Sequence, residues 1–324
     1  MLGLTSLLIR PKYPGFPSGY LLARLCGRRS RLPDGRFPLA IGSESGAAAA
    51  GTRPPAGAES DAVDPWGRMR REFIWLYHQM NDGLRKTFAP LFLWFELPTI
   101  LIALRYQRGG ERERGSRILS TSLLSDRIKE ILTSGKEPHP LLDALAAELE
   151  PLLGPPPPLG DIFRHEGGET AEEQLTTLAL QQLAELPLTP LLHGFFRSVI
   201  DMRNLVALSK QQRWRFQAPG AFVRGGSILP ERLTRTLLQE ERGGILPLVR
   251  ELPGMGDVGI VPANPEPMLL HWLTRAIRRL GREPLEEGII LDYVWRCSLE
   301  ARRRSLLDHC AGMPPDKVAD ETAS

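Results

Sequence analysis

The stretch LTPLLHGFFRSVIDMRNLVALSKQQRWRFQAPGAFVRGGSIL, residues 188–229, decides the fold. Its apolar residues recur in pairs, close to the 3.6-residue period of a helix with one buried side. The pairs are Leu191/Leu192, Phe195/Phe196, Val199/Ile200 and Leu205/Val206. Thr189 and Pro190 indicate where the helix begins, because threonine is a good N-cap and proline loses no hydrogen bond in a first turn.

The polar residues of this stretch have a spacing of their own. Asp201 precedes Asn204 by three residues and Lys210 by nine, so the carboxylate and the amide lie on adjacent turns at the edge of the apolar stripe. Gly225 and Gly226 supply the backbone freedom for a sharp reversal after the helix.

Parts of this pattern recur elsewhere in the chain. FELPTILIALR, residues 95–105, can be aligned with IDMRNLVALSK, residues 200–210, which places Glu96 at the position of Asp201 and Arg105 at the position of Lys210. A fainter third copy, YVWRCSLEARRRSLLDH, carries Glu300 as its acid. Three copies predict a structure assembled from repeated helical units.

The motif IDMRNLVALSKQQR, followed by a glycine pair, resembles the family that comprises the C subunit of bacterial and archaeal V/A-type rotary ATPases and the d subunit of the eukaryotic vacuolar enzyme. Residues 20–32 resemble the first helix of that family, and residues 281–307 resemble its closing element. Tyr293, Glu300 and Arg302 lie where the family pattern expects them. Cys297, Ser298 and Arg303 stand in place of the usual lysine, glutamate and asparagine.

The resemblance implies a funnel-shaped helical adaptor that carries no nucleotide or other cofactor and is not an enzyme. In that family the adaptor lies on the cytoplasmic face of the membrane proteolipid ring, and its cavity receives the foot of the rotor shaft. The expected partners are therefore the shaft subunits and the ring, with one copy of the adaptor per complex. The implied role is to transmit torque for proton or sodium transport.

We therefore expect an all-α fold, a funnel-like array of three pseudo-repeated helical domains. The predicted ranges are an N-terminal arm at 1–17, a first repeat at 18–115, a second at 116–228, a third at 229–312 and a disordered tail at 313–324. Within the first repeat, the Gly-, Ala-, Ser- and Pro-rich residues from about 40 to 65 predict a disordered insertion.

Three helical segments of the first repeat carry further expectations. Residues 20–32 hold four arginines around a leucine side, which we interpret as a solvated basic face. Residues 66–107 are helical, and Pro98 should kink this helix or start a new one. The most apolar segment, residues 91–104, is shorter than the roughly 20 residues that a bilayer core requires, so it predicts a core helix and no membrane span.

Composition is that of a globular protein, with 42% hydrophobic and 24% charged residues. The formal net charge of +3 is too small to argue for nucleic acid. Cys26, Cys297 and Cys310 are odd in number and far apart, which is typical of a reduced cytoplasmic protein. The N-terminal residues do not form the pattern of a signal peptide.

Motifs for bond chemistry are nearly absent. Gly254, Gly256 and Gly259 satisfy G-x-G-x-x-G, but prolines follow where a dinucleotide site needs a helix, so this predicts a plain loop. The sequence has no Walker A loop, H-E-x-x-H, C-x-x-C or G-x-S-x-G motif.

The candidate site residues are the repeated acids Glu96, Asp201 and Glu300. They could form internal ion pairs or caps with Arg105, Arg197, Asn204 or Arg302, or lie at a polar rim that receives another subunit, and both can hold at once. A helical scaffold unrelated to ATPases stays open, as does a basic nucleic-acid-binding protein suggested by the arginines at 24–31 and 302–304.

Overall fold

The computed structural model describes residues 3–32, 64–155, 157–214, 222–238, 244–283 and 285–310. Within these ranges the chain is helical and contains no strand, only one isolated antiparallel bridge between Leu8 and Leu124. The prediction of an all-α fold is confirmed. The predicted tail at 313–324 lies outside the described residues, as does the predicted insertion up to residue 63.

One 3₁₀ helix and fourteen α-helices make up the described chain. They are η1 (Leu4–Leu7), α1 (Ser18–Arg29), α2 (Pro65–Gln79), α3 (Asp82–Arg108), α4 (Arg112–Ser120), α5 (Asp126–Thr133), α6 (Pro138–Glu148), α7 (Glu150–Leu153), α8 (Leu159–Glu166), α9 (Gly168–Glu185), α10 (Pro190–Trp214), α11 (Pro230–Leu238), α12 (Leu246–Glu251), α13 (Glu266–Leu280) and α14 (Glu286–Cys310).

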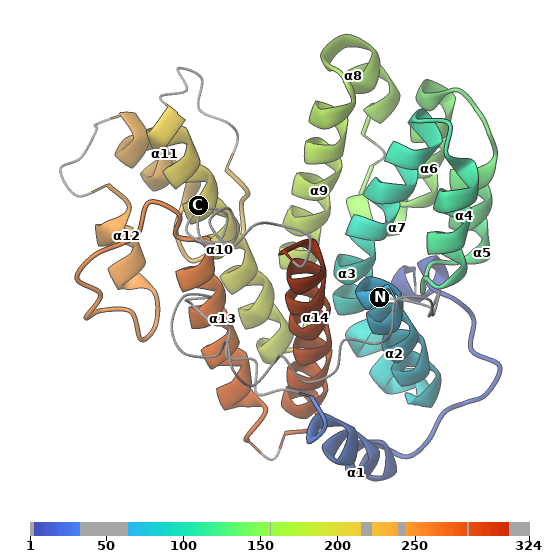
Figure 1. Ribbon diagram of the computed structural model, residues 1–324, viewed down its shortest axis with the longest axis horizontal. Coiled ribbons are helices and arrows are strands. Elements are labelled where there is room, and N and C mark those ends of the chain that lie inside the picture. The colour runs from blue at the N-terminus through green and yellow to red at the C-terminus, as the bar shows by residue number, and fades with distance from the viewer. Residues whose placement is uncertain are drawn as a thin grey trace.

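Helix α14 stands in the middle of the molecule, between a group formed by α10–α13 and a group formed by α3–α9 (Figure 1). Helix α14 packs against α1, α2 and α13. Helix α10 packs against α9, α11 and α13. Helix α3 packs against α4, α5 and α9. One hydrophobic cluster runs from η1 to α14 without interruption. The two ends of the sequence therefore share a core.

Helix α3 runs without a break through two prolines. Its N-terminus is capped by Asn81, whose side chain accepts a hydrogen bond from the backbone of Leu84 at 2.9 Å. The helix then continues to Arg108 through Pro90 and Pro98, so of the two outcomes predicted for Pro98, a kink or a new helix, the new helix is excluded. At 27 residues, α3 is the one helix of the described chain long and apolar enough to cross a membrane, although 67% of its most apolar window is buried inside the protein.

Helix α2 begins inside the range predicted as insertion. Pro65 occupies its first turn, and the side chain of Asp64 accepts hydrogen bonds from the backbone of Trp66 and Gly67 at 3.0 and 2.9 Å. The helix therefore begins one residue before the predicted start at residue 66, because the Asp-Pro pair is a helix start.

Helix α10 begins at Pro190 as predicted, and Thr189 makes a contact that the sequence did not predict. Its hydroxyl donates to Glu287 Oε2 at 2.7 Å, next to the start of α14. The local sequence predicted the helix start correctly, whereas the hydroxyl binds a carboxylate 98 residues away.

The arginines of α1 are not a solvated face. Arg28 binds both carboxylate oxygens of Glu72 at 2.9 and 2.7 Å, and its guanidinium lies 3.8 Å from the ring centroid of Trp75. Tyr293 of α14 donates to the same carboxylate at 2.7 Å. The contacts of Arg28 and Tyr293 on Glu72 join α1, α2 and α14, because charge-assisted hydrogen bonds to one carboxylate fix all three helices.

This junction can be tested at Tyr293. Replacing it with phenylalanine removes the hydrogen bond to Glu72 but preserves the buried ring, so Tyr293→Phe should lower the free energy of unfolding by about 1 kcal/mol. Urea denaturation measures this change. Tyr13→Phe, at an exposed tyrosine, is the control and should leave stability unaltered. Equal stability of the two variants would contradict the role assigned to the junction.

Candidate functional site

Two of the three repeated acids bind the backbone of a turn at the same distance along the chain. Glu96 Oε1 accepts the N–H of Leu123 at 2.7 Å, and Asp201 Oδ1 accepts the N–H of Ile228 at 3.0 Å. In both pairs the acid and the amide are 27 residues apart. We call each such pair an acid–turn clasp. The alignment of Glu96 with Asp201 in the sequence thus has a matching geometry.

The second clasp is reinforced by the other members of its motif. Asn204 donates through Nδ2 to the carbonyl of Val223 at 2.8 Å and accepts the Val223 N–H at 2.9 Å. Gly225 has a φ of 97°, which favours glycine. A Cβ on Gly226 would overlap Asp201 Oδ1. The glycine pair therefore allows both the reversal and the close approach of the turn to the carboxylate.

The first clasp also holds the N-terminal segment. Ile9 donates its N–H to the carbonyl of Leu123 at 2.8 Å, and Ser125 donates to the carbonyl of Leu7 at 2.8 Å. The turn at residues 121–125 is thus fixed by Glu96 on one side and by the N-terminal segment on the other.

Neither clasp acid lies at a polar rim. Glu96 and Asp201 are each 1% exposed, and no arginine is paired with either among the described ion pairs. Burial raises the pKa of Glu96, against the hydrogen bond from Leu123 and the charges of Arg70 and Lys129. Burial likewise raises the pKa of Asp201. Both acids are bound internally, but by backbone amides instead of the expected Arg105, Arg197, Asn204 or Arg302, because amides supply donors without a second buried charge.

Glu300, the third repeated acid, is placed differently. It lies on α14, its Oε1 accepts from the Nε of Arg304, and Arg303 Nη1 lies 3.7 Å from its Oε2. No backbone amide of the described chain donates to it. The third copy of the motif therefore lacks a clasp within the described residues.

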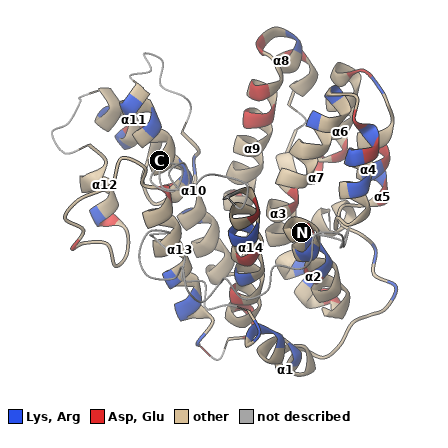
Figure 2. Cartoon of the chain, viewed as in Figure 1, with Lys and Arg blue, Asp and Glu red and all other residues tan. Residues whose placement is uncertain are grey.

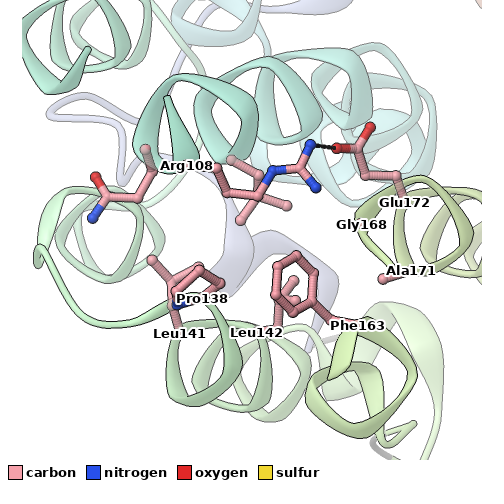
Figure 3. A pocket seen from close by; sticks show the side chains of 10 residues that line it. Arg108, Pro138, Leu141, Leu142, Phe163, Gly168, Ala171 and Glu172 are labelled. Atoms are coloured by element: carbon pink, nitrogen blue, oxygen red, sulfur yellow. Dashed lines mark hydrogen bonds and ion pairs between the residues drawn. The ribbon is translucent and has the colours of Figure 1, made fainter. Parts of the chain in front are cut away.

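The basic residues of the motif do not share one role. Arg105 and Arg108 of α3 both bind Glu172 of α9, at 2.7 and 2.8 Å, and Figure 3 shows Arg108 reaching Glu172 above Phe163. The space beside them is about 20 Å³, enough for one water molecule, so this is a structural junction. Lys210 is exposed.

One cavity is bordered by all three motif helices. Its volume is about 670 Å³, and α3, α10 and α14 all border it together with α2, α4 and α13. The residue two before the acid faces this cavity in each motif helix: Trp94, Val199 and Ser298. Two residues correspond to about 200° around a helix, so each acid points away from the cavity.

Most of the cavity lining is apolar and aromatic. Three of the six tryptophans border it, Trp66, Trp94 and Trp295, and Trp66 is partly exposed. Ile102 also borders it and is 38% exposed. Arg302 borders the cavity and binds Glu266 Oε1 at 2.5 Å. The cavity thus opens to solvent through a mouth that combines apolar side chains with an ion pair.

Centres for bond chemistry are not evident in the part of the chain that the structure describes. No three His, Cys, Asp or Glu side chains there come close enough to hold a metal ion. Cys26 and Cys297 are free thiols. Gly254, Gly256 and Gly259 lie in the loop between α12 and α13, as predicted. Figure 2 shows positive and negative residues mixed along α14.

Sequence reasoning missed the turns that complete the clasps. A shared signal is present, since Ser122-Leu123-Leu124 and Ser227-Ile228-Leu229 have the same serine–aliphatic–leucine order. The donor in each is the middle residue. Aligning the turns as well as the acids would have found the pair.

No known family model matches the sequence, and a search of curated proteins finds no match.

The second clasp predicts a specific cost for a methyl group at Gly226. Gly226→Ala should lower the free energy of unfolding by about 1–3 kcal/mol, since the added Cβ forces the turn away from Asp201. Gly259→Ala is the matched control, because a Cβ there meets nothing within 4 Å. Urea denaturation compares the two. A Gly226→Ala variant as stable as the control would contradict the close approach.

The buried Glu96 predicts a pH dependence. Its folded-state pKa is raised above the ordinary 4.5, so its contribution to stability is present below that value and is lost as pH rises through the folded pKa. Glu96→Gln should therefore gain stability relative to the wild type as pH rises from about 4 to 8. Exposed Glu113→Gln is the control and should track the wild type. A constant difference between Glu96→Gln and wild type across this range would refute the burial effect.

Proposed function

We propose that this chain is the non-catalytic central-stalk adaptor of a V/A-type rotary ATPase. It links the rotor shaft to the membrane proteolipid ring and transmits torque for proton or sodium transport, as one copy per complex at the cytoplasmic face. The observation that carries the proposal is the shared cavity, which is bordered by all three motif helices through the residue two before each acid. An adaptor that receives the foot of a shaft needs a central cavity of this kind.

The proposed architecture is a funnel of three related helical units. The equal spacing of the two clasps supports the equivalence of the α3 and α10 motifs, because unrelated helices have no reason to bind a turn 27 residues later through the same motif position. Leu123 lies beyond residue 115, so the first unit would extend through its turn. The third unit rests on the sequence resemblance around Tyr293, Glu300 and Arg302.

Torque transmission requires a body that does not deform. A single continuous core and two buried clasps supply rigidity, since close-packed interiors transmit strain and have low compressibility. The junction of α1, α2 and α14 at Glu72 joins the two ends of the sequence, so that a load on one unit is shared with the others.

The cavity mouth has the composition of an interface. Trp66 and Ile102 offer exposed apolar surface beside the Arg302–Glu266 ion pair, and aromatic residues and arginine are enriched where partners bind. The shaft contact and the ring contact together need an area above about 1,000 Å² to resist slipping. The cavity would anchor the shaft, and the surrounding surface would supply the remaining area.

The proposal predicts a matched pair of isoleucine variants. Ile102→Asp places a charge at the cavity mouth and should weaken binding of the cognate rotor-shaft subunits about tenfold or more. Ile260→Asp makes the same change at a residue that is 85% exposed and does not border the cavity, so it should bind as the wild type does. Titration calorimetry with the purified full-length chain measures both.

A small apolar molecule is the competing occupant, because cavities of about 300–1,000 Å³ are the size of small-molecule sites. Binding of an apolar dye that Ile102→Asp abolishes, together with no binding of shaft subunits by the wild type, would replace the adaptor by a ligand-binding protein. Equal shaft binding by the two isoleucine variants would also overturn the proposed use of the cavity.

A further inference from the structure

A second cavity lies at the N-terminal end of α3, and we call it the α3 end pocket. Its volume is about 490 Å³, within the size range of small-molecule sites. The N-terminal segment, α2 and α3 all contribute side chains to its lining. It shares no lining residue with the cavity that the three motif helices border.

Basic side chains predominate among the charged groups of this pocket. Arg10, Arg85 and Lys86 border it, and Asp82 is the one carboxylate among its lining residues. Three positive charges and one negative charge leave a formal charge of +2. Asp82 Oδ1 is bound by Arg85 Nη1 at 2.9 Å, whereas Arg10 and Lys86 are exposed and form no ion pair with a described residue. The pocket therefore holds two cations that the protein itself does not neutralise.

The positive charge extends beyond the lining residues. Burial lowers the pKa of His78 on α2, and the charges of Arg85 and Lys12 lower it further. Lys12 belongs to the same N-terminal segment as Arg10. Repulsion between like charges weakens with distance, so this segment brings a further cation close to the same end of α3.

A buried hydroxyl group borders the pocket together with these cations. Tyr77 is 1% exposed, and its ring packs edge-on against Phe92 with the centroids 5.5 Å apart. No described group hydrogen-bonds its hydroxyl, and burial raises the pKa of Tyr77 to about 12. The hydroxyl is not among the enclosed side-chain atoms that lack a partner, so it keeps surface that opens to the pocket. At neutral pH this phenol is protonated and can donate a hydrogen bond.

The shape of the pocket is fixed by the buried guanidinium of Arg85. This side chain donates to the backbone carbonyls of Tyr13, Tyr77 and His78 at 2.9, 3.1 and 3.1 Å. These hydrogen bonds join the N-terminal segment to α2 and α3, the three elements that line the pocket. Its donors are therefore held in place before a ligand binds, which lowers the entropic cost of binding.

We propose that the α3 end pocket binds a phosphate monoester. Arg10 and Lys86 bind its oxygens as cations, and the Tyr77 hydroxyl donates a hydrogen bond to one of them. A phosphate monoester carries a charge of about −1.5 to −2 at pH 7 and three strong acceptor oxygens. This charge matches the formal +2 of the pocket, whereas a carboxylate would neutralise only half of it.

This proposal does not depend on the shaft proposal, because the two cavities have no lining residue in common. A chain that binds no phosphate ester can still bind a rotor shaft. A chain that binds no shaft can still bind a phosphate ester.

Two probes test the proposal and distinguish the sources of the phosphate group. Titration calorimetry of the whole chain with glycerol 3-phosphate tests a soluble ester. Co-sedimentation with phosphatidylcholine vesicles that contain phosphatidic acid tests the same group on a lipid. We expect saturable binding in at least one experiment, and none to glycerol or to vesicles of phosphatidylcholine alone. Binding to the vesicles only would assign the pocket to a lipid headgroup, and absence of binding in both experiments would overturn the proposal.

Matched charge variants locate the site. Arg10→Gln and Lys86→Gln should each weaken binding about tenfold or more, since each removes a charged hydrogen-bond donor. Arg117→Gln and Lys136→Gln remove the same charges at exposed residues outside the pocket and should bind as the wild type does. Equal losses in the two sets would indicate general charge attraction and would overturn the assignment to this pocket.

Tyr77→Phe tests the hydroxyl without changing the charge. It should weaken binding about tenfold and leave the urea midpoint unaltered, because the hydroxyl has no hydrogen-bond partner within the described chain. A Tyr77→Phe variant that is less stable than the wild type but binds the ester equally well would contradict the role assigned to this hydroxyl.

Discussion

A carboxylate buried against a backbone amide is the constraint on which the rest of the structure depends. A carboxyl group at 1% exposure is unfavourable unless it is hydrogen-bonded, so Glu96 and Asp201 require their turns to fold back onto the helix. The amides of Leu123 and Ile228 meet this requirement, and each turn then directs the chain into the next helix. The path of the backbone after α3 and α10 follows from these two contacts.

The position of α14 follows from a different set of charges. Asp292, buried in α14, binds Arg29 of α1 at 3.2 Å and Arg296 of its own helix at 2.9 Å. Together with Tyr293 and Glu72, these contacts hold the first and last helices side by side. The three motif helices can then surround one cavity, because α14 is fixed between the other two (Figure 1).

The features of the structure that depend on residues close together in the chain could be predicted from the sequence. Helical periodicity gave the all-α fold, Pro190 marked the start of α10, and the alignment of Glu96 with Asp201 identified two positions with matching environments. Prediction from the sequence failed for features that depend on contacts between residues far apart in the chain. The hydroxyl of Thr189 binds Glu287, and α3 continues through Pro98 because buried packing outweighs the lost backbone hydrogen bond. The turns of the clasps were missed for the same reason.

The central claim is that a partner enters the cavity among the three motif helices. Hydrogen exchange of the whole chain, alone and with the rotor-shaft subunits proposed as its partners, tests this most directly, because it reports each segment separately. The account predicts slower exchange on binding in residues 94–106, 195–203 and 295–303 together. Slower exchange confined to outer helices such as α8, or no change in any of the three segments, would contradict it.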